Sequence, residues 1–127
     1  MAKTAKKIIL IVEDDEVLLR ALYLLFHKSG NTIASATYGD EALKMTLRIK
    51  PDIVLLDLLL PVMNGFDYLK DIRSNPDFKN LPIIVLSNLG DQENIAKAKG
   101  LGATDYYIKA DTDLSTLYDK VDKILKT

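Results

Sequence analysis

Residues 51–61 read Pro-Asp-Ile-Val-Leu-Leu-Asp-Leu-Leu-Leu-Pro, and Asp57 is the carboxylate embedded in this apolar run. A strand that is buried on both faces is apolar throughout instead of alternating, so Ile53–Leu56 fits the centre of a parallel sheet covered by helices. Asp57 then follows the carboxyl end of the strand. Ligands of open α/β sheets bind at that end of the strands, so we interpret Asp57 as a functional residue rather than a loop-capping carboxylate.

The rest of the chain alternates in the same way between β-branched apolar runs and segments with apolar residues at helical spacing. Strands are expected at residues 8–12, 32–36, 53–56, 81–86 and 103–108. Helices are expected at residues 16–28 and 39–49, from the cap Asn64 to Arg73, from about Asp91 to Gly100, and after a cap at Asp111 or Thr112. This alternation predicts an α/β fold, a flavodoxin-like doubly wound sheet of five parallel strands in the order 2-1-3-4-5, with five helices.

Composition narrows the possible partners. The 127 residues fit one domain, and 17 basic against 18 acidic residues give a net charge of -1, which argues against nucleic acid as a direct partner. Cys is absent, and no signal peptide or membrane-spanning run stands out, so we expect a soluble, cytoplasmic protein that does not bind membranes. Lys3, Lys6 and Lys7 fit a solvated chain end and are assigned no role.

Polar residues follow the carboxyl ends of four of the expected strands. Glu13 and Asp14 follow the first, Asp57 the third, Ser87 the fourth and Lys109 the fifth. In the order 2-1-3-4-5 the switch point lies between strands 1 and 3, so the three acids should meet there, with Ser87 and Lys109 alongside. Taken singly each residue has an ordinary explanation; Asp14 or Asp15, for instance, could cap the first helix.

Three carboxylates in one place repel each other unless a cation neutralises them, and Mg²⁺ is the cation that best suits an all-oxygen site. The single histidine, His27, falls on the first helix away from this rim, which disfavours zinc or copper and suits a surface or interfacial residue. An aspartate beside bound Mg²⁺ can attack phosphorus and carry an aspartyl phosphate. We therefore predict Asp57 as the nucleophile, with Lys109 and Ser87 as contacts to the phosphoryl oxygens.

The chain resembles, from end to end, the receiver domain of two-component response regulators. The motifs that carry the resemblance are Ile11-Val12-Glu13-Asp14, Pro51 to Asp57, Leu60-Pro61 with Gly65, Leu86-Ser87, and Gly102-Ala103-Thr104-Asp105-Tyr106 leading to Lys109. The resemblance implies Asp57 as phosphoacceptor, Glu13, Asp14 and the Leu59 carbonyl as further Mg²⁺ ligands, and Ser87 and Lys109 as phosphate contacts. It also implies that Tyr106 is the aromatic that changes rotamer with Ser87; ordinary packing of an aromatic in an edge strand is the alternative.

Two positions depart from the family pattern. Ala110 stands where the family usually has a proline after a cis bond; because cis costs about 3–4 kcal/mol before a non-proline residue and about 0.5–1 before proline, we expect a trans bond or a relaxed loop. Val62 stands where the family often has glycine, with an effect that the sequence does not define.

Leu59 and Leu89, both apolar, flank the path of water to the phosphoryl group, which predicts slow self-dephosphorylation.

The resemblance implies a phosphorylation-dependent switch. A histidine kinase, a phosphotransfer protein or a small acyl phosphate would phosphorylate Asp57, and the face of helix 4, strand 5 and helix 5 would signal to a downstream protein or support a phosphorylation-dependent dimer. The chain would be one receiver domain over residues 1–127 without an output domain, free-standing or excised, and an enzyme only toward its own phosphorylation and dephosphorylation. The alternatives are an unphosphorylated pseudo-receiver, a haloacid-dehalogenase-type phosphatase, which needs Asp-x-Asp after the first strand and a cap domain, and a flavodoxin.

Overall fold

The computed structural model describes residues 6–126, so Lys3 lies outside the described residues. The strands are β1 Ile8–Val12, β2 Thr32–Ala36, β3 Ile53–Leu56, β4 Ile83–Ser87 and β5 Asp105–Ile108. The helices are α1 Glu16–His27, α2 Gly39–Ile49, α3 Gly65–Arg73, α4 Gln92–Gly100 and α5 Leu114–Leu125. Two short 3₁₀ turns, η1 Pro76–Phe78 and η2 Lys109–Asp111, complete the described elements.

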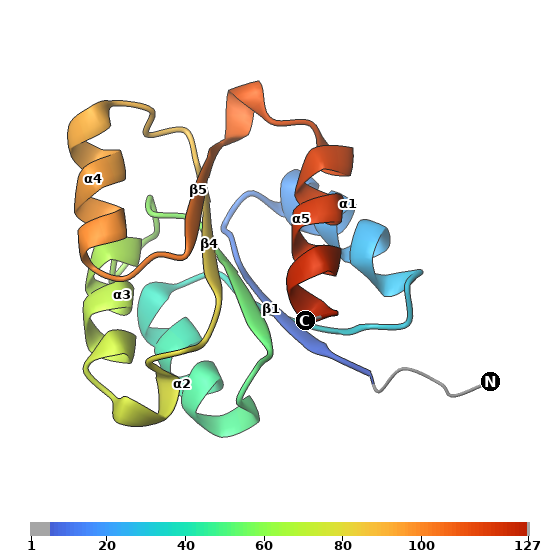
Figure 1. The fold of residues 1–127 in the computed structure, drawn as a ribbon, viewed down its shortest axis with the longest axis horizontal. Coiled ribbons are helices and arrows are strands. Elements are labelled where there is room, and N and C mark those ends of the chain that lie inside the picture. The colour runs from blue at the N-terminus through green and yellow to red at the C-terminus, as the bar shows by residue number, and fades with distance from the viewer. Residues whose placement is uncertain (1–5, 127) are drawn as a thin grey trace.

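The strands form one parallel sheet in the order β2-β1-β3-β4-β5, which confirms the predicted flavodoxin-like topology. Helices α2, α3 and α4 cover one face of the sheet, and α1 and α5 cover the other (Figure 1). Alternate residues of the central strands therefore enter two separate cores. Leu56 of β3 packs with α2 to α4, whereas its neighbour Leu55 packs with α1 and α5.

Burial follows this layering. Every residue of β3 and β4 is buried, as expected for strands covered on both faces. The edge strand β5 is half-buried, and the edge strand β2 is largely half-buried or exposed. A buried hydrogen bond links α2 to α3 across one core, since the hydroxyls of Thr46 and Tyr68 lie 2.7 Å apart. Because an unpaired buried hydroxyl is costly, this contact fixes how the two helices meet.

Side-chain caps mark the starts of α1, α3, α4 and α5. The Asn64 and Asp91 side chains accept the N–H groups of Asp67 and Asn94, which confirms these two predicted starts. The predicted cap of the last helix at Asp111 or Thr112 was wrong. The chain first forms η2, and α5 begins only at Leu114, with the Asp113 carboxylate accepting the N–H of Thr116 at 2.8 Å.

The end of α3 is tied to the segment between α4 and β5 by Arg73. Its guanidinium donates from Nε and Nη2 to the carbonyl of Gly102, at 3.0 and 2.7 Å, and from Nη1 to the carbonyl of Phe78 at 2.6 Å. Gly102 has a φ of +108°, and a Cβ there would lie 2.7 Å from Cγ of Arg73. Glycine is therefore required at 102 for both reasons, and Arg73 joins α3 firmly to the start of β5.

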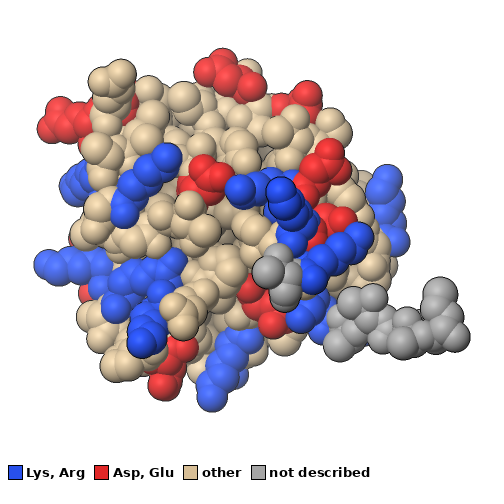
Figure 2. All heavy atoms as spheres, in the orientation of Figure 1, with Lys and Arg blue, Asp and Glu red and all other residues tan. Residues whose placement is uncertain are grey.

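The surface carries both signs of charge. In Figure 2 acidic side chains lie among the basic ones on the face that it shows. Among residues 6–126 no helix combines the length and apolar character that crossing a bilayer needs.

Candidate functional site

The three predicted acids meet at the carboxyl end of the sheet. Val12 and Leu56 are register partners in β1 and β3, so the residues that follow them emerge side by side, and the N–H of Asp57 donates to the carbonyl of Val12 at 3.0 Å. One carboxylate oxygen from each of Glu13, Asp14 and Asp57 lies within 4.8 Å of the others. Oxygen ligands gathered this closely are consistent with binding of a divalent metal.

The members of this acid cluster differ in their surroundings. Glu13 and Asp57 are buried, with 2% and 4% of their surface exposed, whereas Asp14 is exposed. Burial raises the pKa of Glu13 above its ordinary value, although hydrogen bonds from Lys109 and from the Asp15 N–H act against the rise. Asp15 is not part of the cluster, because its side chain caps α1 by accepting the N–H groups of Val17 and Leu18.

Lys109 bridges the two buried acids. Its Nζ lies 2.8 Å from Oε1 of Glu13 and 2.8 Å from Oδ2 of Asp57. Desolvation alone would lower the pKa of Lys109, but the hydrogen bonds to Asp57 and Glu13 outweigh it and hold this pKa above the ordinary value. The sequence predicted the position of Lys109 at the site, and the structure adds that its ammonium is already paired with the acids.

The backbone around Asp57 is equally constrained. Its Oδ1 accepts the N–H of Leu59 at 3.2 Å. Helix α3 begins directly against this turn, because the N–H of Gly65 donates to the carbonyl of Leu58 at 3.0 Å. A Cβ at position 65 would lie 2.6 Å from the carbonyl oxygen of Asp57, so glycine is needed there. The Leu59 carbonyl, implied as a metal ligand, stays a prediction.

Ser87 and Tyr106 are connected through Leu89 instead of through the acid cluster. Ser87 is fully buried at the end of β4, and its Oγ accepts the N–H of Leu89 at 3.4 Å. The half-buried Tyr106 donates its hydroxyl to the Leu89 carbonyl, and burial raises its pKa. The two predicted switch residues thus hold the same loop, residues 88–90.

Sequence reasoning missed Asn88. Its Oδ1 accepts the N–H of Ala110 at 3.2 Å and so joins the loop after β4 to the turn after β5. Two features of the sequence could have indicated this contact. Asn88 offers a side-chain acceptor directly after β4, and Ala110, unlike proline, offers an N–H directly after Lys109. The Lys109–Ala110 peptide bond is trans, which confirms the expectation for a non-proline at 110.

His27 lies away from the site, as predicted. Its ring is exposed on α1 and stacks on Tyr23 with the ring centroids 5.0 Å apart. It therefore contributes no ligand to the acid cluster.

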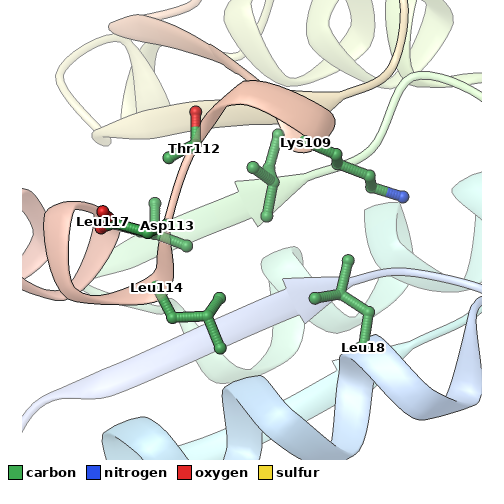
Figure 3. A pocket seen from close by; sticks show the side chains of 7 residues that line it. Leu18, Lys109, Thr112, Asp113, Leu114 and Leu117 are labelled. Carbon is green, nitrogen blue, oxygen red and sulfur yellow. The ribbon is translucent and has the colours of Figure 1, made fainter.

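A small apolar pocket lies beside the site between α1, β4 and α5. It is lined by Leu18, Leu86, Lys109, Thr112, Asp113, Leu114 and Leu117. In Figure 3 the ammonium of Lys109 points away from Leu114 and Leu117 of this pocket. The pocket therefore contacts the aliphatic part of Lys109, and the charged chemistry lies on the other side of that side chain.

A sequence model of the response regulator receiver domain matches residues 9–122, and the chain belongs to this family, whose members act in two-component signal transduction. It is similar to the transcriptional regulatory protein AfsQ1 of Streptomyces coelicolor, with 34% identity over 101 residues that make up 80% of this chain and 44% of AfsQ1. It is also similar to the chemotaxis protein CheY of Thermotoga maritima, with 38% identity over 105 residues, 81% of this chain and 85% of that one. The chain thus spans less than half of AfsQ1 but most of CheY.

Solved structures support the same assignment. A response regulator from Chloroflexus aurantiacus is 32% identical and superposes with a TM-score of 0.88, covering 97% of this chain and 100% of that one. The Mn²⁺-bound form of the response regulator Rcp1 is 27% identical with a TM-score of 0.79, covering 93% of this chain and 91% of that one. The fold is therefore that of a receiver domain.

Proposed function

We propose that this chain is a phosphorylation-dependent signalling switch in which Asp57 accepts the phosphoryl group. The observation that carries the proposal is the buried Asp57 carboxylate at the end of β3, held between the ammonium of Lys109 and the acids Glu13 and Asp14. Family membership supports it, since the matched residues 9–122 contain every member of this cluster.

In the proposed reaction a carboxylate oxygen of Asp57 attacks the phosphorus of a phosphohistidine on a kinase or phosphotransfer protein, or of a small acyl phosphate. The new P–O bond forms as the P–N bond, or the P–O bond to the acyl group, breaks and the leaving group takes the electron pair. The ammonium of Lys109 then offsets charge on the phosphoryl oxygens, and the Ser87 hydroxyl donates to one of them. The chain acts as an enzyme only on itself.

Glu13, Asp14 and Asp57 would hold Mg²⁺, with the Leu59 carbonyl as a further ligand. The set is made of oxygens, and the sequence has no Cys to favour a softer metal. The similar response regulator Rcp1 has an Mn²⁺-bound form, which supports binding of a divalent ion by a relative. When bound, the metal supplies positive charge against the transferred phosphoryl oxygens.

The output of the proposed switch is a change in the face made by α4, β5 and α5. Ser87 and Tyr106 both contact Leu89, so an inward movement of the Ser87 hydroxyl toward a phosphoryl group would release the Tyr106 contact and shift residues 88–90. A downstream protein or a second copy of the chain would recognise the shifted face. Direct binding of nucleic acid or membrane is not part of this proposal.

The test is incorporation of labelled phosphate from acetyl phosphate in the presence of Mg²⁺. The wild-type chain and Asp71→Asn, which changes an exposed aspartate of α3, should label equally, and Asp57→Asn should not label. Equal labelling of Asp57→Asn would show that the acceptor is elsewhere. A folded wild-type chain that takes no label from acetyl phosphate or from any kinase would instead be a pseudo-receiver.

A further inference from the structure

The turn that carries Lys109 begins without a cap of its own. In η2, Lys109–Asp111, the preceding residue is Ile108, whose side chain has no oxygen to accept the first free N–H groups of the turn. The N–H of Ala110 finds its acceptor 22 residues away in Oδ1 of Asn88, at 3.2 Å. This bond is available because Ala110, unlike proline, has an N–H.

The loop that carries Asn88 is itself anchored to β5. The carbonyl of the next residue, Leu89, accepts the hydroxyl of Tyr106 from β5. Gly90 lies against Ile108, since a Cβ at position 90 would be 3.1 Å from Cδ1 of Ile108. The loop that carries Asn88 is therefore held to β5 at two other points, and the exposed Asn88 side chain reaches the turn from this loop.

The turn in question orients Lys109. Lys109 is the first residue of η2. The Lys109 ammonium contacts Glu13 and Asp57 at the same time and lies 2.8 Å from an oxygen of each. A rotation of the Lys109–Ala110 peptide at one end of this side chain would displace the ammonium at the other end. An acceptor that holds the Ala110 N–H would limit this rotation.

We propose that Asn88 is a positioning residue for phosphoryl transfer, which caps the turn after β5 and so aims the Lys109 ammonium at Asp57. This inference rests on the proposed role of Lys109 and Asp57 in phosphorylation. It assigns a function to a side chain that touches neither the acids nor the phosphoryl group, and it explains how the chain holds Lys109 without a proline at 110.

The first experiment measures the rate of phosphorylation by acetyl phosphate at saturating Mg²⁺. Asn88→Ala should slow the reaction by about 2- to 10-fold, the range of a net hydrogen bond. Asn80→Ala, an exposed asparagine in the turn before β4, should react at the wild-type rate. Replacing Ala110 by lactic acid removes the N–H and keeps the side chain, so it should slow the reaction as much as Asn88→Ala does.

The two changes should not add, because they break the same hydrogen bond. A chain with both changes should react no more slowly than either single variant. Fold-changes that multiply in the double variant, or a wild-type rate for Asn88→Ala, would overturn the proposal.

A second measurement is independent of phosphorylation. Hydrogen exchange of the Ala110 amide, followed by NMR, should be faster in Asn88→Ala and remain slow in Asn88→Asp, which keeps an acceptor oxygen. Unchanged exchange in Asn88→Ala would show that the cap is absent in solution and overturn the proposal. The Ala110 amide could exchange faster in Asn88→Ala even though acetyl phosphate does not label the wild-type chain. That result would contradict the proposed role of Asp57 as phosphoacceptor and would support the cap formed by Asn88.

Discussion

The ammonium nitrogen of Lys109 lies as close to Oδ2 of Asp57 as to Oε1 of Glu13, at 2.8 Å from each. One positive charge is thus shared by two buried carboxylates, and the exposed Asp14 adds a third carboxylate within 4.8 Å. Three carboxylates and one ammonium leave an excess of two formal negative charges. A divalent cation would balance this excess, which makes the metal dependence of stability the most direct probe of the site.

Asp14→Asn should raise the melting temperature in the presence of EDTA by about 1–3 °C, because it removes one of three mutually repelling charges. It should also remove most of the stabilisation that Mg²⁺ gives the wild-type chain. Thermal unfolding in EDTA and in MgCl₂ measures both effects, with Asp71→Asn as the control. An Mg²⁺-induced rise in Asp14→Asn as large as that of the wild type would contradict the metal site.

Leu59 and Leu89 should make the phosphorylated chain long-lived. Leu59 is 53% exposed next to the acceptor turn and Leu89 is half-buried, and neither side chain can hold an attacking water by a hydrogen bond. Leu89→Gln and Leu59→Asn should therefore shorten the phosphoryl half-life several-fold. Decay of labelled protein after removal of the donor gives the half-lives, and equal values for the three proteins would refute the prediction.

Val62 lies at the centre of a strained turn. Its φ is +70°, the Met63 N–H donates to the Pro61 carbonyl at 2.8 Å, and 81% of its surface is exposed. This three-residue γ-turn disfavours a β-branched residue, and exposure means that little packing would be lost. Val62→Gly should stabilise the fold by about 0.5–1 kcal/mol. This value is the backbone strain that glycine relieves, reduced by the larger conformational entropy that glycine loses on folding.

Val62→Ala is the matched control, because alanine keeps the Cβ that disfavours a positive φ. Urea denaturation should give it a free energy of unfolding close to that of the wild type. If Val62→Gly unfolds at the same or a lower urea concentration than Val62→Ala, strain at this turn is not the cause.

Tyr68 should make the stability fall at high pH. Thr46 donates its hydroxyl to the Ala42 carbonyl at 2.7 Å, so Tyr68 donates to Thr46, and burial raises the pKa of Tyr68 to about 12. The hydroxyl of Tyr68 loses its proton near pH 10 in the unfolded chain and near pH 12 in the folded chain. The contribution of Tyr68 to the free energy of unfolding is therefore fully present below about pH 10 and declines above it.

Comparison with Tyr68→Phe isolates this group from other titrations. At pH 11 the wild-type chain should have lost about 1.4 kcal/mol more than Tyr68→Phe, each measured against its own value at pH 8. Urea denaturation at the two pH values gives the difference. Parallel losses in the two proteins would show that Tyr68 ionises as easily in the folded chain as in the unfolded one.

The fold and most of the site could be predicted because both depend on patterns along the chain. The apolar run at Ile53–Leu56 gave a central strand, and the parallel order then required Glu13, Asp14 and Asp57 to meet. Contacts between loops were not predictable in this way. The pairing of Asn88 with Ala110 depends on how two turns of irregular backbone approach each other, and no periodicity reports that. The cap at Asp113 was missed for the same reason, since η2 delays the start of α5.

The grip of Arg73 on the Gly102 carbonyl has a mechanical consequence for α4. The helix is fastened near its last residue, Gly100, by two guanidinium hydrogen bonds, while its first turn follows the loop of residues 88–90. A displacement of that loop would therefore tilt α4 about its C-terminal end beside Arg73. The shift would be largest at Gln92 and smallest at Gly100. Distance probes attached along the helix would then report displacements that decrease from Gln92 to Gly100, instead of one displacement shared by the whole helix.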